Sequence, residues 1–460
     1  MDSLSIKEKL KKLREGVISA EENIKGFLKK IDKDNNDYNI FLHVNKDALK
    51  QAKEIDKKIK EKKAGKLAGL AIAVKSCINV KGLPITCASK TLENYIGTYD
   101  SDAIKKIKKE DGIIIGMVNM DEFASGNSGE TSYYGPTKNP ACLDVVPGGS
   151  SSGSGAAVAA QMCDLALGTD TGGSVRSPAS HCGIVGVKPS YGRVSRFGLI
   201  DLSMSFDQIG VLSPDVYGAE ILLEVISGYS ENDAITKDEP VQKYTGKKET
   251  KLRVGFSVES EKLSKNKELL EIIKKKAEKL CSNLNLKLIP VDLEYTKLAV
   301  QTYYPIVYVE FFSGTRKFDG RKYGHVIEET CGKEALRRIL GGKEISKSEY
   351  HGSYYKKALA VKSLVKNDFE KAFKKVDVIL SPVTPNLPHK LGDNLMAENP
   401  EEGYAQDAFT IPANLAGICG GVVNAGKING IPVGIQILAP EFREDLMFSA
   451  MELLEKLSNS

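Results

Sequence analysis

The chain has 460 residues and a formal net charge of +5 at pH 7, with 41% hydrophobic and 27% charged residues. These proportions are ordinary for a soluble globular protein, and no stretch approaches the roughly 20 apolar residues that a helix needs to cross a bilayer. The first residues, MDSLSIKEKLKKLREG, predict a charged helix and not a secretory signal. The composition therefore argues against a membrane-embedded protein, and we expect no membrane partner.

Helical patterns dominate the start of the chain. Residues 1–65 predict two helices separated by a turn at 31–39, and we expect this N-terminal helical segment to pack on the core. The apolar run LAGLAIAVKS, at 67–76, predicts a buried strand that ends in Lys75. The next predicted elements are a helix over 101–110 and a strand over 112–119.

Strands and helices alternate in the second half. A strand at 251–258, a helix at 265–283 and a strand at 287–293 form a βαβ-like unit, which predicts a parallel pair of strands. The later elements are expected to be strands at 376–385 and 430–440 and an amphipathic helix at 443–457.

The most informative segment is VPGGSSSGSGAAVAAQMCDLALGTDTGGSVRSP, at 146–178. Two Gly/Ser-rich turns flank a predicted helix and strand, and glycines beside a serine let main-chain N–H groups approach a ligand closely. A flexible linker is one alternative, but a buried helix and strand follow the first turn at once. A phosphate-binding loop is another, but it requires a lysine that GSGAA lacks.

A serine hydroxyl needs a neighbouring base to become a good nucleophile. None of the histidines stands in the context of a catalytic triad: His43, His181, His325, His351 and His389. A buried lysine can replace histidine, because burial lowers its pKa toward neutrality, and Lys75 is the best-placed candidate. Its alternative role is a lysine that extends to solvent from a strand end. Ser150 would relay the proton, and the TDTGGS turn offers an oxyanion hole from Thr171, Gly172 and Gly173.

These motifs resemble the amidase signature family, whose hallmark is GGSS(G/S)GS followed by GTDTGGS(I/V)R.P, with the same spacing between the lysine and the two serines. The resemblance implies that Ser174 is the acyl-enzyme nucleophile, that Ser150 is a bridging serine after a cis Gly149–Ser150 peptide, and that Lys75 is the base. It also implies an α/β fold: one large domain, at 66–460, with a central mixed β-sheet covered by helices on both faces.

Further segments resemble the A subunits of tRNA-dependent amidotransferases within that family. They are NMDEFASGNSGETSYYGPTKNP (119–140), KPSYGRVSRFGLI (188–200), SFDQIGVLSPDV (205–216), FDGRKYG (318–324), YYKKALAVKSLVKNDFEKAFKKVDVILSPVTP (354–385) and AFTIPANLAG (408–417). The resemblance implies a glutaminase that supplies ammonia to B and C partner subunits, which convert Glu-tRNA(Gln) or Asp-tRNA(Asn) to the amide. Aminoacyl-tRNA would be held mainly by the B subunit, and ATP and Mg would be used by the partner, with no cofactor or metal in this chain.

The resemblance also implies residues that hold glutamine. Asp407 matches the acid expected at the α-amino group, and Tyr323 is a candidate wall of the pocket. Lys362 stands where the family usually has an arginine for the α-carboxylate; it keeps the charge but loses the bidentate fork. Ser76 replaces the aspartate that commonly follows the lysine. For Asp407 and Tyr323, an ordinary packing or surface role is the alternative.

The remaining sequence patterns concern metal binding, the cellular compartment and the charged surface. Eight cysteines at irregular spacing include no CxxC pair, which argues against zinc and favours reduced thiols in the cytoplasm. Lysine clusters at 7–13, 53–63 and 271–280 alternate with acids and are interpreted as solvated helix faces. Besides the glutaminase subunit, two hypotheses remain: a free-standing amidase that acts on a small amide, and an assembly scaffold that has lost its activity.

Overall fold

The computed structural model describes residues 4–246, 248–249, 251–347 and 350–458. In chain order its strands are β1 (Phe41–Val44), β2 (Ala71–Lys75), β3 (Ile113–Val118), β4 (Leu165–Asp170), β5 (Val185–Lys188), β6 (Gln208–Ser213), β7 (Val254–Ser257), β8 (Ile289–Val291), β9 (Val378–Pro382), β10 (Cys419–Ile428) and β11 (Ile431–Ala439). They form one 11-stranded sheet in the order β1-β3-β2-β4-β6-β5-β10-β11-β9-β7-β8.

The sheet is mixed. β2 runs parallel to β3 and β4, and β7 runs parallel to β8 and β9, whereas the other neighbouring strands are antiparallel. Every residue of β2 and β3 is buried, as expected for parallel strands covered on both faces. Because β2 and β4 are parallel neighbours, their carboxyl ends place Lys75 and Thr169 at the same edge of the sheet.

Helices surround the sheet. They are α1 (Ile6–Arg14), α2 (Ala20–Tyr38), α3 (Ala48–Lys60), α4 (Asp102–Lys109), α5 (Ser152–Ala159), α6 (Arg176–Cys182), α7 (Val216–Ile226), α8 (Val258–Leu263), α9 (Lys267–Asn283), α10 (Ala299–Thr315), α11 (Ile327–Thr330), α12 (Lys333–Ile345), α13 (Ser353–Ala372), α14 (Leu395–Glu398), α15 (Pro400–Ala405), α16 (Ile411–Ala416) and α17 (Glu444–Ser458), with 3₁₀ turns at Lys90–Leu92, Glu122–Ala124 and Glu294–Leu298. Among the described helices, none is long and apolar enough to span a membrane.

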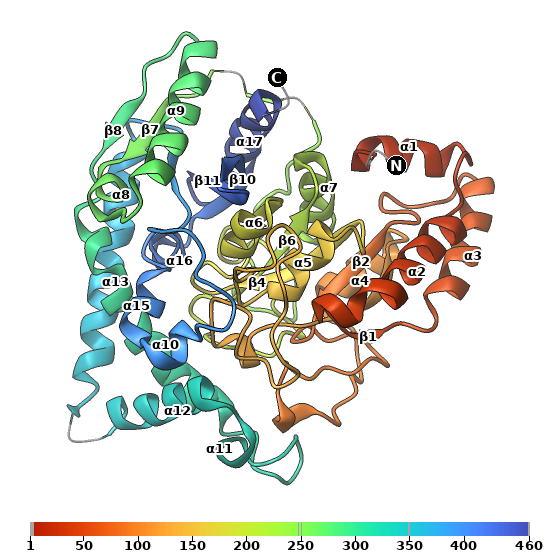
Figure 1. The fold of residues 1–460 in the computed structure, drawn as a ribbon, viewed down its shortest axis with the longest axis horizontal. Coiled ribbons are helices and arrows are strands. Elements are labelled where there is room, and N and C mark those ends of the chain that lie inside the picture. Colours follow the sequence, from red (N-terminus) through yellow and green to blue (C-terminus); the bar gives the residue numbers. More distant parts are fainter. Residues whose placement is uncertain (1–3, 247, 250, 348–349, 459–460) are drawn as a thin grey trace.

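Two consecutive glycines of β10 show that both faces are covered. A Cβ at Gly420 would meet the Arg176 side chain of α6, and a Cβ at Gly421 would meet Met451 of α17. Successive residues of a strand point to opposite faces, so α6 and α17 lie on opposite sides of the sheet. The expected α/β fold with a mixed, helix-covered sheet is confirmed. Figure 1 shows α1–α3 at one end of the molecule and α8, α9, β7 and β8 at the other.

Most predicted elements are present. The predicted strand before Lys75 is β2, the helix and strand after it are α4 and β3, and the βαβ-like unit is β7–α9–β8 with its two strands parallel. The late elements are β9, β11 and α17.

The predicted turn at 31–39 is wrong, because α2 continues to Tyr38. Ile24 and Ile31 are buried in this helix, whereas the polar residues at 32–37 are exposed or half-buried. The Asn35 side chain accepts hydrogen bonds from the N–H groups of Ile40 and Phe41, which ties the helix end to β1. β1 was not predicted. It pairs with β3, so the N-terminal segment contributes a strand to the sheet; a domain boundary at residue 65 stays a prediction.

Substitution of Gly153 tests how closely α5 packs on the sheet. A Cβ there would lie 2.5 Å from the O and 2.6 Å from the N of Asn119. We expect Gly153→Ala to lower the stability by about 1–3 kcal/mol through overpacking, measured as the denaturant or thermal unfolding midpoint. Gly26→Ala is the matched control, because a Cβ on this exposed residue of α2 meets nothing within 4 Å; it should raise stability by up to about 1 kcal/mol. If both changes had the same effect on stability, the close packing of α5 would be contradicted.

Candidate active site

A buried lysine surrounded by hydroxyl groups forms the centre of the site. Lys75 ends β2 and has no exposed surface. Its Nζ lies 2.7 Å from Ser150 Oγ, 2.8 Å from Thr169 Oγ1 and 3.0 Å from Ser151 Oγ. Within the described residues no carboxylate forms an ion pair with it.

Burial sets the charge state of this lysine. Loss of hydration lowers the pKa of Lys75, and the nearby acidic groups of Cys77, Asp121, Asp207 and Asp170 raise it only in part. Because an ammonium is disfavoured without water or a paired carboxylate, burial shifts the equilibrium of Lys75 toward the neutral amine, which can accept a proton. The geometry suits a general base.

Ser150 is held in place by its own backbone. The Gly149–Ser150 peptide is cis, as the resemblance implied, and Gly148 has φ +78°. The Ser150 carbonyl accepts a hydrogen bond of 3.1 Å from the Asp121 N–H. A Cβ at Gly149 would meet the Asp121 carboxylate at 2.0 Å, so only glycine fits there. Tight backbone packing therefore directs the Ser150 hydroxyl to Lys75.

The TDTGGS turn is shaped by a buried ion pair. Asp170 accepts hydrogen bonds from the N–H groups of Gly173 (2.9 Å) and Val175 (3.2 Å). Arg176 donates to both oxygens of the same carboxylate, at 3.0 and 2.9 Å, and both side chains are fully buried. Burial alone would raise the pKa of Asp170, but Arg176 outweighs it and holds this pKa well below the ordinary range. The turn is therefore fixed by a charge that stays ionised.

Ser174 follows this turn and lies beside the first one. Its carbonyl accepts a hydrogen bond of 3.2 Å from the Ser151 N–H, next to Ser150. Of the predicted oxyanion donors, the Gly173 N–H already donates to Asp170. The N–H groups of Thr171 and Gly172 donate no turn or side-chain hydrogen bond in the described part of the chain. Gly173, with φ +137°, therefore shapes the turn. The two N–H groups that an oxyanion could use are those of Thr171 and Gly172.

Asp407 is connected to the same turn through Thr410. The Thr410 hydroxyl donates to the Gly172 carbonyl at 2.6 Å and lies 3.1 Å from the Asp407 carbonyl. The Asp407 carboxylate accepts hydrogen bonds from Asn127 (3.0 Å) and Tyr304 (3.4 Å). Burial raises the pKa of Asp407 to about 7, against the opposing effect of Asn127. The carboxyl group therefore changes charge near neutral pH.

Lys362 is connected to the turn through two aromatic rings that are tilted against each other. Its Nζ lies 5.3 Å from the centre of the Phe206 ring, and that ring is 5.3 Å from the ring of Tyr303. Tyr303 packs so closely on Gly172 that a Cβ there would lie 2.8 Å from its hydroxyl. Lys362 also lines a cavity of about 170 Å³ with Ser205 and others.

Tyr323 lies apart from these contacts. Its side chain is 43% exposed. The Lys322 ammonium lies over its ring, and Tyr95 and Tyr99 are close enough to interact with it electrostatically. The structure thus brings Lys75 and Ser150 into direct contact and joins Ser174, Asp407 and Lys362 to them through the turn. It gives no such connection to Tyr323, whose role as a pocket wall stays a prediction.

Sequence reasoning did not single out several residues of the site. They are Ser151, Thr169, Asp170 and Arg176 around the two turns, and Asp121, Asn127 and Thr410 behind them. Asp170 and Arg176 carried a usable signal, because charged residues inside a run of small and apolar residues are rarely buried unless paired.

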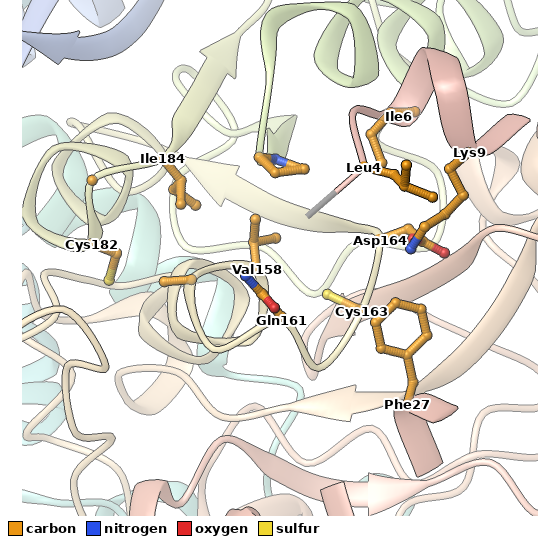
Figure 2. Close-up of a pocket in the computed structure, with 13 residues that line it drawn as sticks. Leu4, Ile6, Lys9, Phe27, Val158, Gln161, Cys163, Asp164, Cys182 and Ile184 are labelled. Atoms are coloured by element: carbon orange, nitrogen blue, oxygen red, sulfur yellow. The ribbon is translucent and has the colours of Figure 1, made fainter. Parts of the chain in front are cut away.

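Two further features lie outside this site. A cavity of about 420 Å³ opens between α1 and the ends of α5 and α6, and an ion pair of 2.5 Å between Lys9 and Asp164 lies in its wall (Figure 2). All eight cysteines are free. No three His, Cys, Asp or Glu side chains gather as a metal site in the residues that the structure describes.

Comparisons with known proteins identify the family of this chain. Residues 22–448 match a protein-family model described as Amidase. The chain is 50% identical over 438 residues to the A subunit of the glutamyl-tRNA(Gln) amidotransferase of Methanococcus maripaludis, covering 95% of this chain and 99% of that protein. Its identity to the A subunit of the same enzyme from Methanothermobacter thermautotrophicus is 50%, covering 98% of each.

A solved structure extends the likeness. The A subunit of the glutamyl-tRNA(Gln) amidotransferase of Thermotoga maritima superposes with a TM-score of 0.82 at 35% identity, covering 99% of this chain and 94% of that one. The family model and the relatives both match most of the chain. This chain therefore belongs to the amidase family.

Proposed function

We propose that this chain is the glutamine-hydrolysing A subunit of a tRNA-dependent amidotransferase. The observation that carries the proposal is the contact of 2.7 Å between Lys75 Nζ and Ser150 Oγ in a fully buried shell of hydroxyls. The names of relatives that are 50% identical along 95% of the chain, which call them A subunits of a glutamyl-tRNA(Gln) amidotransferase, support the choice of a tRNA-dependent amidotransferase.

In the proposed mechanism, Ser174 Oγ attacks the side-chain amide carbon of glutamine. The Ser174 proton passes to Ser150, whose own proton passes to the Lys75 amine. The N–H groups of Thr171 and Gly172 stabilise the oxyanion that forms. The proton then returns from Lys75 through Ser150 to the leaving nitrogen, ammonia departs, and water hydrolyses the glutamyl ester at Ser174 to glutamate.

The rest of the reaction belongs to the assembly. B and C subunits would receive the ammonia in the cytoplasm, and the B subunit would hold Glu-tRNA(Gln) or Asp-tRNA(Asn). ATP and Mg would activate the acceptor carboxylate there. Asp407 would bind the α-amino group of glutamine and Lys362 the α-carboxylate, with Tyr323 as a wall of the pocket.

A free-standing amidase is the second candidate, and Lys362 is the observation that favours it. A lysine lacks the planar fork with which arginine binds a carboxylate. The same lysine and serines at the centre of the site would then hydrolyse another small amide without tRNA.

Ser174→Ala should abolish amidation of mischarged Glu-tRNA and Asp-tRNA with glutamine, because the nucleophile is lost, and free ammonium should restore it. The chain would be co-expressed with the B and C subunits of its source, and amide formed on tRNA would be measured. Glutamine hydrolysis by Ser174→Ala within about tenfold of wild type would rule out this nucleophile. Amide hydrolysis by the chain alone, with no tRNA amidation in the complex, would establish the free-standing amidase.

The pKa of Asp407, raised to about 7, predicts how glutamine binding depends on pH. Below that pH the carboxyl is protonated and no longer attracts the α-ammonium group, so the KM for glutamine should rise as pH falls from 8 to 6. Asp407→Asn should have a high KM that no longer changes over this range. Asp319→Asn, at an exposed acid beside Arg321, is the control and should follow wild type. A pH-dependent KM in Asp407→Asn would contradict the role.

Lys362→Met should raise the KM for glutamine about tenfold or more, since a hydrogen bond to a charged group contributes about 1.5–3 kcal/mol, and kcat should change little. Lys362→Arg should keep or lower the KM. Lys357→Met, at an exposed lysine of the same helix, is the control for loss of charge on α13. If Lys362→Met binds glutamine like wild type, another group holds the carboxylate.

A further inference from the structure

The hydrogens around Lys75 can be assigned from the atoms that accept them. A neutral lysine amine has two N–H bonds and one lone pair, and three hydroxyl oxygens surround this one. Which hydroxyl faces the lone pair decides which proton the base can accept.

Ser151 cannot donate to Lys75, because its only hydrogen is already used. The Ser151 hydroxyl donates to the Thr169 carbonyl at 3.1 Å, and a carbonyl can only accept. The same oxygen accepts the Thr169 N–H at 3.1 Å. Its remaining contact, at 3.0 Å from Lys75, must therefore be an N–H of the lysine pointing to Ser151.

Ser150 and Thr169 both present their hydroxyl groups to Lys75. Lys75 is the only hydrogen-bond partner of the Ser150 hydroxyl among the described residues, and the Thr169 hydroxyl lies 2.8 Å from the same amine. Since the proposed mechanism passes the Ser150 proton to Lys75, Ser150 donates to the lone pair and Thr169 accepts the second lysine N–H.

The charged groups near Lys75 do not compete for these positions. Asp121 accepts from Gly129 and Thr131, Asp207 from Thr171, Leu202 and Ser203, and Asp170 from Arg176 and the turn. With the Cys77 thiol, these are the titratable groups that act on Lys75. They affect the pKa of Lys75 electrostatically and do not hydrogen-bond to it. The three hydroxyl groups therefore determine the orientation of its amine.

We infer that Ser151 and Thr169 are positioning residues that hold the two N–H bonds of Lys75, so that its lone pair faces the Ser150 proton. The inference rests on the proposed mechanism. When Ser174 attacks, the Ser150 O–H bond breaks and a third N–H bond forms on Lys75, while Ser150 takes the Ser174 proton. The new ammonium charge balances the oxyanion, and all three hydroxyls then accept hydrogen bonds from it.

Thr169→Val tests this inference, because it keeps the β-branched shape and removes only the hydroxyl. In the assembled complex, kcat for glutamine hydrolysis should fall about tenfold or more, within the range that positioned proton transfer contributes, with the KM little changed. Loss of an acceptor for the ammonium should also move the acidic limb of the kcat profile to lower pH. Thr169→Ser should restore both values.

Matched variants separate positioning from a general loss of packing. Thr302→Val removes a buried hydroxyl that donates only to the Leu298 carbonyl and should leave both values unchanged. Should Thr169→Val fail to fold, Ser151→Ala decides the question with the same expected changes. Its control is Ser154→Ala, on the neighbouring helix α5, whose hydroxyl donates to the Leu167 carbonyl away from Lys75.

The outcomes distinguish this inference from the proposed function. Wild-type activity that disappears in Ser174→Ala is the baseline, and its absence would refute the proposed function itself. With that baseline present, a kcat within about twofold of wild type and an unmoved acidic limb in folded Thr169→Val or Ser151→Ala would overturn the positioning role alone.

Discussion

The active site depends on burying the Lys75 amine without a paired carboxylate among the described residues. A buried ammonium without such a partner is strongly disfavoured, so the protein supplies hydroxyl groups from one turn, Ser150 and Ser151, and from the neighbouring strand β4, Thr169. Those groups converge only because β2 and β4 are parallel neighbours whose carboxyl ends meet at one edge of the sheet. The same edge is where ligands usually bind in parallel sheets.

A second buried group, the Asp170 carboxylate, keeps its charge. Asp170 is also fully buried, yet the guanidinium of Arg176 keeps it ionised, and its two oxygens bind the N–H groups that close the TDTGGS turn. In the described part of the chain, Lys75 is thus left without an ion pair, which lowers its pKa, whereas Asp170 is paired and stays ionised. The contrast explains how a base and a rigid anion-binding turn can stand close together in one dry core.

The residues proposed to bind glutamine lie on separate elements. Asp407 precedes α16, and Lys362 lies on α13, so neither belongs to the sheet edge that carries the serines. Thr410 connects Asp407 to Gly172, and Phe206 and Tyr303 connect Lys362 to the same glycine. Both proposed substrate contacts are therefore connected to the TDTGGS turn at one residue.

The sequence by itself determined the family and most elements. The two Gly/Ser turns, the strand that ends in Lys75 and the parallel unit around α9 were all predictable, since glycines, apolar runs and helical periodicity are local signals. Tertiary structure decided what depends on distant partners. Asn35 binds the start of β1 and extends α2 through a polar run that is typical of a turn, Asp170 occupies the Gly173 N–H that was expected to bind an oxyanion, and Ser151 and Thr169 complete the shell of Lys75. These contacts join residues on different elements, and no local pattern encodes which donor meets which acceptor once the strands have paired.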